Sequence, residues 1–246
     1  MDKLQKIALN YKSLLDKYYI FEIARKQKIV QFMLTFDKAD LNHLMGLHKL
    51  TDIAGLQSEH RKSKIFDRIL KGDISEELIK RSRFYDKIYV RLDYLEKLED
   101  ILDSNQIIFK YMEKSNQISR IEADYLLQNA HQTDIIYIFL SERAKTEQTA
   151  FPVMCCRSFF PMDKLDYTKN QPSYTLLKKI KVDAITGEKT VQYDRSRILA
   201  QAKQAASEPE RRSIMQRLNE KKAQMAINEV LAEKNREKNK HEHERF

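Results

Sequence analysis

The sequence predicts an α+β protein in which helices and strands occupy separate stretches of the chain. Apolar residues recur at helical spacing between residues 40 and 104, whereas between 106 and 194 they follow the period of two that is typical of strands. A chain that alternated single strands with single helices would instead favour a parallel α/β sheet. We therefore expect an N-terminal β-hairpin, a helical section, an antiparallel β-sheet and a C-terminal basic helical tail.

A short helix is expected to open the chain, and a β-hairpin follows it. The segments 18–24 and 28–36 are rich in β-branched and aromatic residues, and the polar Arg25, Lys26 and Gln27 separate them. A helix over residues 40–56 comes next. Asp37 or Asp40 can cap it, because a short carboxylate accepts hydrogen bonds from the free amides of a first turn. We expect Asp40 to be the cap.

Further helices are expected over residues 58–72, 74–82 and 83–104. The last of them carries an apolar stripe formed by Ile88, Leu92, Leu95, Leu98 and Leu102. This stripe should face the core.

Strand signals fill the next part of the chain, from residue 106 to residue 194. Polar or turn residues such as Pro161, Pro172 and Gly187 separate the apolar segments. The expected strands lie at 107–112, 121–127, 135–143, 151–160, 174–182 and 188–194. Together they predict an antiparallel sheet after the helices.

The C-terminal region differs from the rest in charge. The chain carries a formal charge of +9, and residues 195–246 contain 13 Lys and Arg against 8 Asp and Glu, so this region accounts for +5. Ser207 and Pro209 mark an expected helix start, and the apolar stripe beyond them is thin. We therefore expect one domain over residues 1–195 and a basic helical tail over 196–246.

The composition excludes several classes of protein. No apolar run approaches the roughly 18 residues of a membrane span, and the first residues lack the features of a signal peptide, so a cytoplasmic protein with no membrane partner is expected. Cys155 and Cys156 are adjacent and suit neither a structural disulfide nor a metal site. We expect no metal site and no cofactor. The basic balance favours a polyanion such as nucleic acid as the partner.

Several segments in order resemble a known family. The stretch FMLTFDKADLNHLMGLHKL, followed by QIIFKYM, IEADYLL, IIYIFL, CRSFFP and DYTKNQPSYTLLKK, is similar to phage-associated nucleases of the barnase, EndoU, colicin and RelE-like (BECR) fold, which occur in phages and integrative elements. The similarity covers about residues 18–195. It implies a toxin-like, metal-independent endoribonuclease, a hydrolase in which the 2′-hydroxyl of the RNA attacks the adjacent phosphate.

This reaction needs a base, an acid and cations that stabilise the phosphorane charge, and histidines are the first candidates for the proton transfers. His43 and His48 lie five residues apart, or about 140° around one helix, so they should not share a site easily. His43 shares a stripe with Leu47 and Leu50 and should be buried. His48 has Asp52 one turn on, where a carboxylate could orient its ring. Either histidine could equally be a hydrogen-bonded core residue.

The strands supply the candidate phosphate ligands. Arg157 and Ser158 interrupt an apolar strand, and by alternation Arg157 should face away from Cys156, where a guanidinium could hold a phosphate. An ion pair with Glu142 or Asp166 is an equally good interpretation. Lys178 is the second candidate cation for catalysis. The expected substrate-binding residues are Lys49, Ser158, Asp166, Tyr167, Thr168, Gln171, Tyr174 and Thr175.

Two hypotheses follow from these residues. The first is an RNA-cleaving nuclease that uses His43 or His48 with Arg157 and Lys178. The second is a non-catalytic nucleic-acid-binding or assembly protein of a mobile element, and in either case the C-terminal helix could dock on an inhibitor or another element-encoded protein. An open cleft that holds a histidine within about 10 Å of both cations favours the enzyme.

Overall fold

The structure is a computed structural model that describes residues 1–56, 62–104, 106–115, 121–144 and 149–203, with four further positions at 215, 218, 221 and 222. The chain divides into two units, Met1–Arg195 and Ser196–Phe246. The described residues of the second unit are helical and exposed. The expected helix start at Ser207 and Pro209 lies outside the described residues. Within the described ranges no helix is long and apolar enough to cross a membrane.

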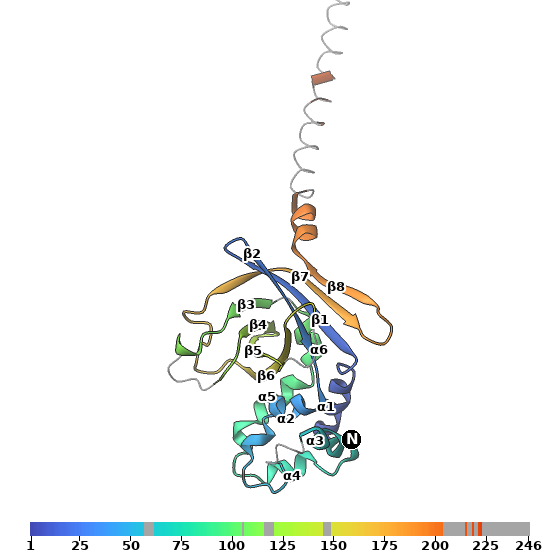
Figure 1. The fold of residues 1–246 in the computed structure, drawn as a ribbon, viewed down its shortest axis with the longest axis vertical. Helices are drawn as coiled ribbons and strands as arrows, with labels where there is room; N and C mark the ends of the chain where they lie inside the picture. The colour runs from blue at the N-terminus through green and yellow to red at the C-terminus, as the bar shows by residue number, and fades with distance from the viewer. Residues whose placement is uncertain are drawn as a thin grey trace, which may run out of the picture. The chain divides into compact units, whose positions relative to one another are not determined.

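Helices and strands of the first unit follow one another as drawn in Figure 1. The helices are α1 (Lys3–Lys12), α2 (Lys38–Met45), α3 (Lys62–Lys71), α4 (Glu76–Lys80), α5 (Tyr89–Leu95) and α6 (Leu98–Asp103), with short 3-10 turns η1 (Leu47–Lys49), η3 (Tyr85–Lys87) and η4 (Glu113–Ser115). The strands are β1 (Lys17–Arg25), β2 (Lys28–Thr35), β3 (Gln106–Lys110), β4 (Tyr125–His131), β5 (Asp134–Glu142), β6 (Val153–Pro161), β7 (Ser173–Asp183) and β8 (Lys189–Asp194).

The strands form a closed barrel, so the prediction of a separate N-terminal hairpin and an open antiparallel sheet is wrong. In the described part of the chain the order is β1-β2-β6-β5-β4-β3-β7, and β7 pairs back with β1. Strand β8 lies outside the barrel on β7. One pairing is parallel, between β2 and β6, with Met33 opposite Val153 and Leu34 opposite Met154. Closure gives every barrel strand a neighbour on both sides, which removes open sheet edges.

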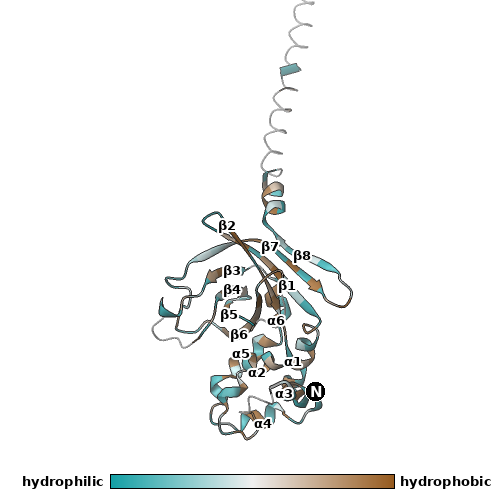
Figure 2. Cartoon of the chain, in the orientation of Figure 1, coloured by the Kyte–Doolittle hydropathy of each residue, from teal (hydrophilic) through white to brown (hydrophobic). Residues whose placement is uncertain are grey.

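Aromatic rings fill the inside of the barrel. Phe21 stacks on Phe32 with ring centroids 4.9 Å apart, and Phe32 stacks in turn on Tyr125, 5.0 Å away on a strand that is not its neighbour. Along β5, side chains alternate between this core and a second, smaller cluster on the other face of the strand, to which Tyr137 and Phe139 belong. Figure 2 shows hydrophobic residues concentrated along the barrel strands.

Asp37 caps helix α2, and not Asp40 as predicted. The Asp37 carboxylate accepts from the backbone N–H of Ala39 at 2.8 Å, and the Asp40 carboxylate accepts in return from the backbone N–H of Asp37 at 2.9 Å. This reciprocal pair is a capping box. Asp40 also pairs with Arg143, so its side chain serves both contacts.

The predicted helix over residues 83–104 is broken into η3, α5 and α6. Its apolar stripe is nevertheless buried as expected, since Ile88, Leu92, Leu95, Leu98 and Leu102 are each at most 2% exposed. Although the helix is broken, the apolar side chains of these segments still face the core. It also positions residues 86–91 beside α2 and β6, where the candidate site lies.

Candidate active site

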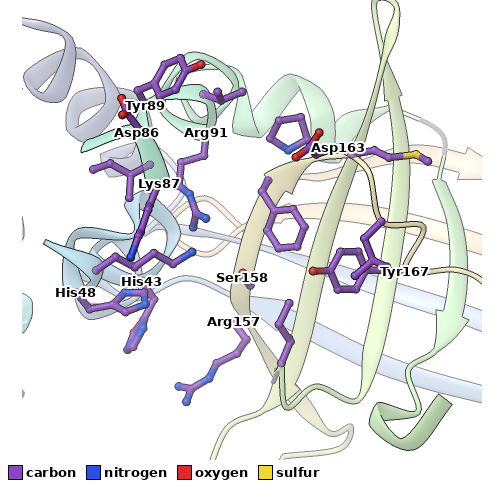
Figure 3. Close-up of a pocket in the computed structure, with 18 of the residues that line it drawn as sticks. His43, His48, Asp86, Lys87, Tyr89, Arg91, Arg157, Ser158, Asp163 and Tyr167 are labelled. Atoms are coloured by element: carbon purple, nitrogen blue, oxygen red, sulfur yellow. The ribbon is translucent and has the colours of Figure 1, made fainter. Parts of the chain in front are cut away.

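A pocket of about 1140 Å³ lies between the helical segments and strand β6. Figure 3 shows His43, His48, Lys87 and Arg91 on the helical side and Arg157 and Ser158 on the strand. The lining residues are His43, His48, Lys49, residues 86–91, Ile121, Glu122, Arg157, Ser158 and residues 160–165 with Tyr167. Five Lys or Arg side chains and two histidines face three carboxylates in this lining, so the pocket is cationic.

The two histidines are neighbours, contrary to the expectation from one continuous helix. Helix α2 ends at Met45 because Gly46 adopts the left-handed conformation with a φ of 76°, and η1 then turns His48 back beside His43. The centroids of the two rings are 5.1 Å apart. His43 is half-buried and His48 is exposed, so neither is a core histidine.

Asp52 does not orient His48 as the sequence suggested. Its carboxylate accepts hydrogen bonds from the Ser82 hydroxyl and the backbone N–H of Arg83. It therefore fixes the turn that leads to η3. The break at Gly46 removes the helical spacing on which the predicted pair with His48 depended.

The pocket environment disfavours charge on His48 and Lys49. Although His48 keeps contact with solvent, partial desolvation and then the nearby His43, Lys49 and Arg91 lower its pKa to about 4. Desolvation, followed by the charges of Arg91 and Lys87, lowers the pKa of Lys49 to about 8. At neutral pH the first residue is a neutral imidazole and the second an ammonium ion that releases its proton more readily than an ordinary lysine.

Arg91 is a residue of the candidate site that was not predicted from the sequence. Its side chain is buried, with the residue 6% exposed, and within the described ranges it forms no ion pair with a carboxylate. Desolvation lowers its pKa to about 10, so it is still charged at neutral pH. Its position, three residues after Ile88 and four before Leu95, places a cation on the buried stripe, and this was the signal available in the sequence.

Arg157 enters the pocket through a β-bulge. Phe139 pairs with Ser158 and Leu140 pairs with Cys156, so Arg157 is the extra residue on β6. A bulge re-aims side chains locally, which explains why the consecutive Arg157 and Ser158 both line the pocket. Simple alternation, on which the prediction rested, does not. Among the described residues Arg157 makes no ion pair, so neither alternative partner, Glu142 or Asp166, neutralises it.

Six of the predicted site residues lie outside the pocket. Lys178 lies on β7 with its ammonium 3.9 Å from the Asp194 carboxylate. The carboxylate of Asp166 accepts from the Tyr137 hydroxyl at 3.0 Å, and Gln171 exchanges two hydrogen bonds with the backbone of Met112. The ion pair joins β7 to β8, and the contacts of Asp166 and Gln171 hold loops in place. The others outside the lining are Thr168, Tyr174 and Thr175.

The structure brings together the predicted residues His43, His48, Lys49, Arg157, Ser158 and Tyr167. It adds Lys87, Arg91, Glu122, Phe160 and Lys164 to the lining. Of these five, only Arg91 carried a signal in the sequence, because it places a charge on an apolar stripe. The other four look like ordinary surface or core residues in the sequence. In the described part of the chain no group of three His, Cys, Asp or Glu side chains could hold a metal ion.

Comparison with known proteins gives one family match, which covers most of the first unit. The family model described as phage-Barnase-EndoU-ColicinE5/D-RelE like nuclease 4 matches residues 3–196, which include every residue of the pocket lining. No curated protein and no solved structure gives a significant match. The chain therefore belongs to this phage-related nuclease family, whose substrates are nucleic acids.

Proposed function

We propose that the protein is a metal-independent endoribonuclease that cleaves RNA through attack of the substrate's 2′-hydroxyl on the adjacent phosphate. One observation carries this proposal: a single pocket joins a neutral histidine to lysine and arginine side chains that have no carboxylate partners among the described residues. The family membership supports cleavage of a nucleic acid. We further propose a toxin-like role in the cytoplasm of a host cell, for a phage or an integrative element.

In this mechanism His48 is the general base. Its pKa of about 4 keeps the imidazole neutral at pH 7, so it can take the proton of the 2′-hydroxyl. The 2′-oxygen then forms a bond to phosphorus while the bond from phosphorus to the 5′-oxygen breaks. Lys49, with a pKa of about 8, is still protonated at pH 7 and can give a proton to the departing 5′-oxygen. The products are a 2′,3′-cyclic phosphate and a free 5′-hydroxyl.

Arg91 and Arg157 would bind the phosphate from two sides of the pocket. Negative charge accumulates on the phosphate oxygens in the transition state, and a planar guanidinium can donate two parallel hydrogen bonds to them. Arg91 is held in place by burial, so it loses little conformational freedom when it binds. An anion in the pocket would supply the opposite charge that this buried cation lacks among the described residues.

The test is incubation of the purified full chain with RNA in excess EDTA, beside DNA of the same sequence. We expect cleavage of the RNA and not of the DNA, because only RNA carries the attacking hydroxyl. Cleavage of both, or cleavage that requires Mg²⁺, would contradict the proposed reaction. Binding of both without cleavage under any condition would favour the second candidate, a non-catalytic nucleic-acid-binding protein.

A further inference from the structure

The pocket has an aromatic wall that the cleavage step does not use. Phe160, on β6, and Tyr167, in the loop that follows it, both line the pocket and are half-buried. Their ring centroids are 5.4 Å apart and their planes lie at 66°. Figure 3 shows Tyr167 on the other side of Ser158 from His43 and His48. The same lining holds a cationic wall formed by Lys49, Lys87 and Arg157, so the two walls border one pocket.

Both rings are held rigidly from behind. Phe139 stacks on Phe160 at 5.5 Å with an angle of 25° between the planes, and it meets Tyr167 edge-on at 5.4 Å and 83°. The loop that carries Tyr167 is anchored by Asp166, whose carboxylate accepts from the Tyr137 hydroxyl and from the backbone N–H of Thr168. A ring that is already fixed loses little entropy when a flat ligand packs against it.

Arg91 connects the aromatic wall to the cationic wall. The centre of its guanidinium lies 5.9 Å from the centroid of the Phe160 ring, and the same guanidinium adjoins Gly46, which separates the two histidine-bearing segments. A phosphate held by Arg91 would therefore be next to the aromatic wall. A single nucleotide matches this arrangement, because it carries an anionic phosphate at one end and an aromatic base at the other.

We propose that Phe160 and Tyr167 form a nucleobase subsite, so that the pocket takes a nucleotide whose base is unpaired. Inside a duplex each base is covered on both faces by its stacked neighbours, whereas an unpaired base can turn a bare face to a protein ring. The pocket volume of about 1140 Å³ leaves room for the whole nucleotide. This inference rests on the proposed function and narrows its substrate to single-stranded RNA or unpaired loops.

Binding of 2′-O-methyl RNA tests the subsite separately from cleavage, because this RNA lacks the attacking hydroxyl. The full chain is titrated with a short single-stranded oligonucleotide, with the same oligonucleotide in a duplex, and with an abasic strand of equal length and charge. We expect the duplex and the abasic strand to bind about 5- to 150-fold more weakly, since this is the factor that stacking of one base on an aromatic side chain contributes.

Substitutions of single residues test whether the ring of Tyr167 contributes to binding of the base. Tyr167→Leu should weaken binding of the single strand about 5- to 150-fold and leave the abasic strand unchanged. Tyr167→Phe keeps the ring and should bind like the wild type. Tyr193→Leu removes a half-buried tyrosine on β8 outside the pocket and should also change nothing. A thermal unfolding curve for each variant shows that it folds, and the abasic comparison on the wild type needs no variant.

Equal binding of the single strand, the duplex and the abasic strand would overturn the subsite. So would unchanged binding by a folded Tyr167→Leu protein. These outcomes differ from failure of the proposed function. A chain that discriminates between bases and abasic sites but never cuts RNA keeps the subsite and loses the nuclease, whereas one that cuts RNA without regard to base or pairing does the reverse.

Discussion

Gly46→Ala tests how the backbone builds the candidate site. Gly46 has a φ of 76°, and a Cβ there would lie 2.9 Å from Cγ2 of Ile88 and 3.1 Å from the Arg91 guanidinium. The left-handed conformation costs an alanine about 1–2 kcal/mol. Crowding against Ile88, which is 1% exposed and cannot move aside, should add about 1–3 kcal/mol. We expect a total loss of about 2–5 kcal/mol in the free energy of unfolding.

Gly187→Ala is the matched control. Gly187 has a nearly identical φ of 74°, but nothing lies within 4 Å of the Cβ position there. This variant should lose only the conformational cost of about 1–2 kcal/mol. Urea unfolding of both variants measures the difference, and RNA binding should fall only for Gly46→Ala, because its new methyl group displaces Arg91. Equal losses of stability in the two variants would refute the close approach of α5 to Gly46.

Three further predictions concern charge. Arg91→Met removes a buried cation that lacks a carboxylate partner among the described residues, so it should raise Tm while weakening RNA binding about 10- to 100-fold. Arg83→Met changes an exposed arginine outside the pocket, so Tm and RNA binding should both stay nearly unchanged. A lower Tm with intact RNA binding in Arg91→Met would contradict this reasoning. A plot of kcat/KM for RNA cleavage against pH should rise through about pH 4 as His48 loses its proton and fall through about pH 8 as Lys49 loses its proton. A value of kcat/KM that keeps rising beyond pH 9 would exclude Lys49 as the acid. Burial lowers the pKa of Lys179 from 10.5 to about 8, so between these pH values the unfolded chain binds more protons than the folded one and the free energy of unfolding should rise with pH. Denaturant titrations at several pH values should show a smaller rise for Lys179→Met. An unchanged slope of the free energy of unfolding against pH would show that Lys179 is not the group responsible.

Local patterns predicted the elements of the fold better than their arrangement. The alternation of apolar and polar residues placed strands close to their observed positions, and the stripe from Ile88 to Leu102 is core as expected. The spacing of apolar residues along a strand does not show which other strand will pair with it. The parallel pairing of Met33 with Val153 joins residues far apart in the chain, and no local signal marks it, so the closed barrel was missed.

The candidate site was predicted in part for a related reason. Helical spacing set His43 and His48 on different faces, but it assumed that the helix continues through Gly46. A glycine near the end of an apolar pattern can equally terminate a helix, and here it does, which brings the rings together. Arg157 reaches the pocket through a bulge, and Lys178 points elsewhere because β7 carries it away from this side of the barrel. Such placements depend on tertiary structure.

The end groups of the cleavage products test the central claim most directly. Wild-type protein, His48→Ala and His43→Ala are incubated with one RNA oligonucleotide in excess EDTA, and the 3′ ends are identified. The mechanism predicts a 2′,3′-cyclic phosphate from the wild type and a rate about 10² to 10⁴ times lower for a folded His48→Ala protein. Products that end in a 3′-hydroxyl, or full activity in His48→Ala, would contradict it.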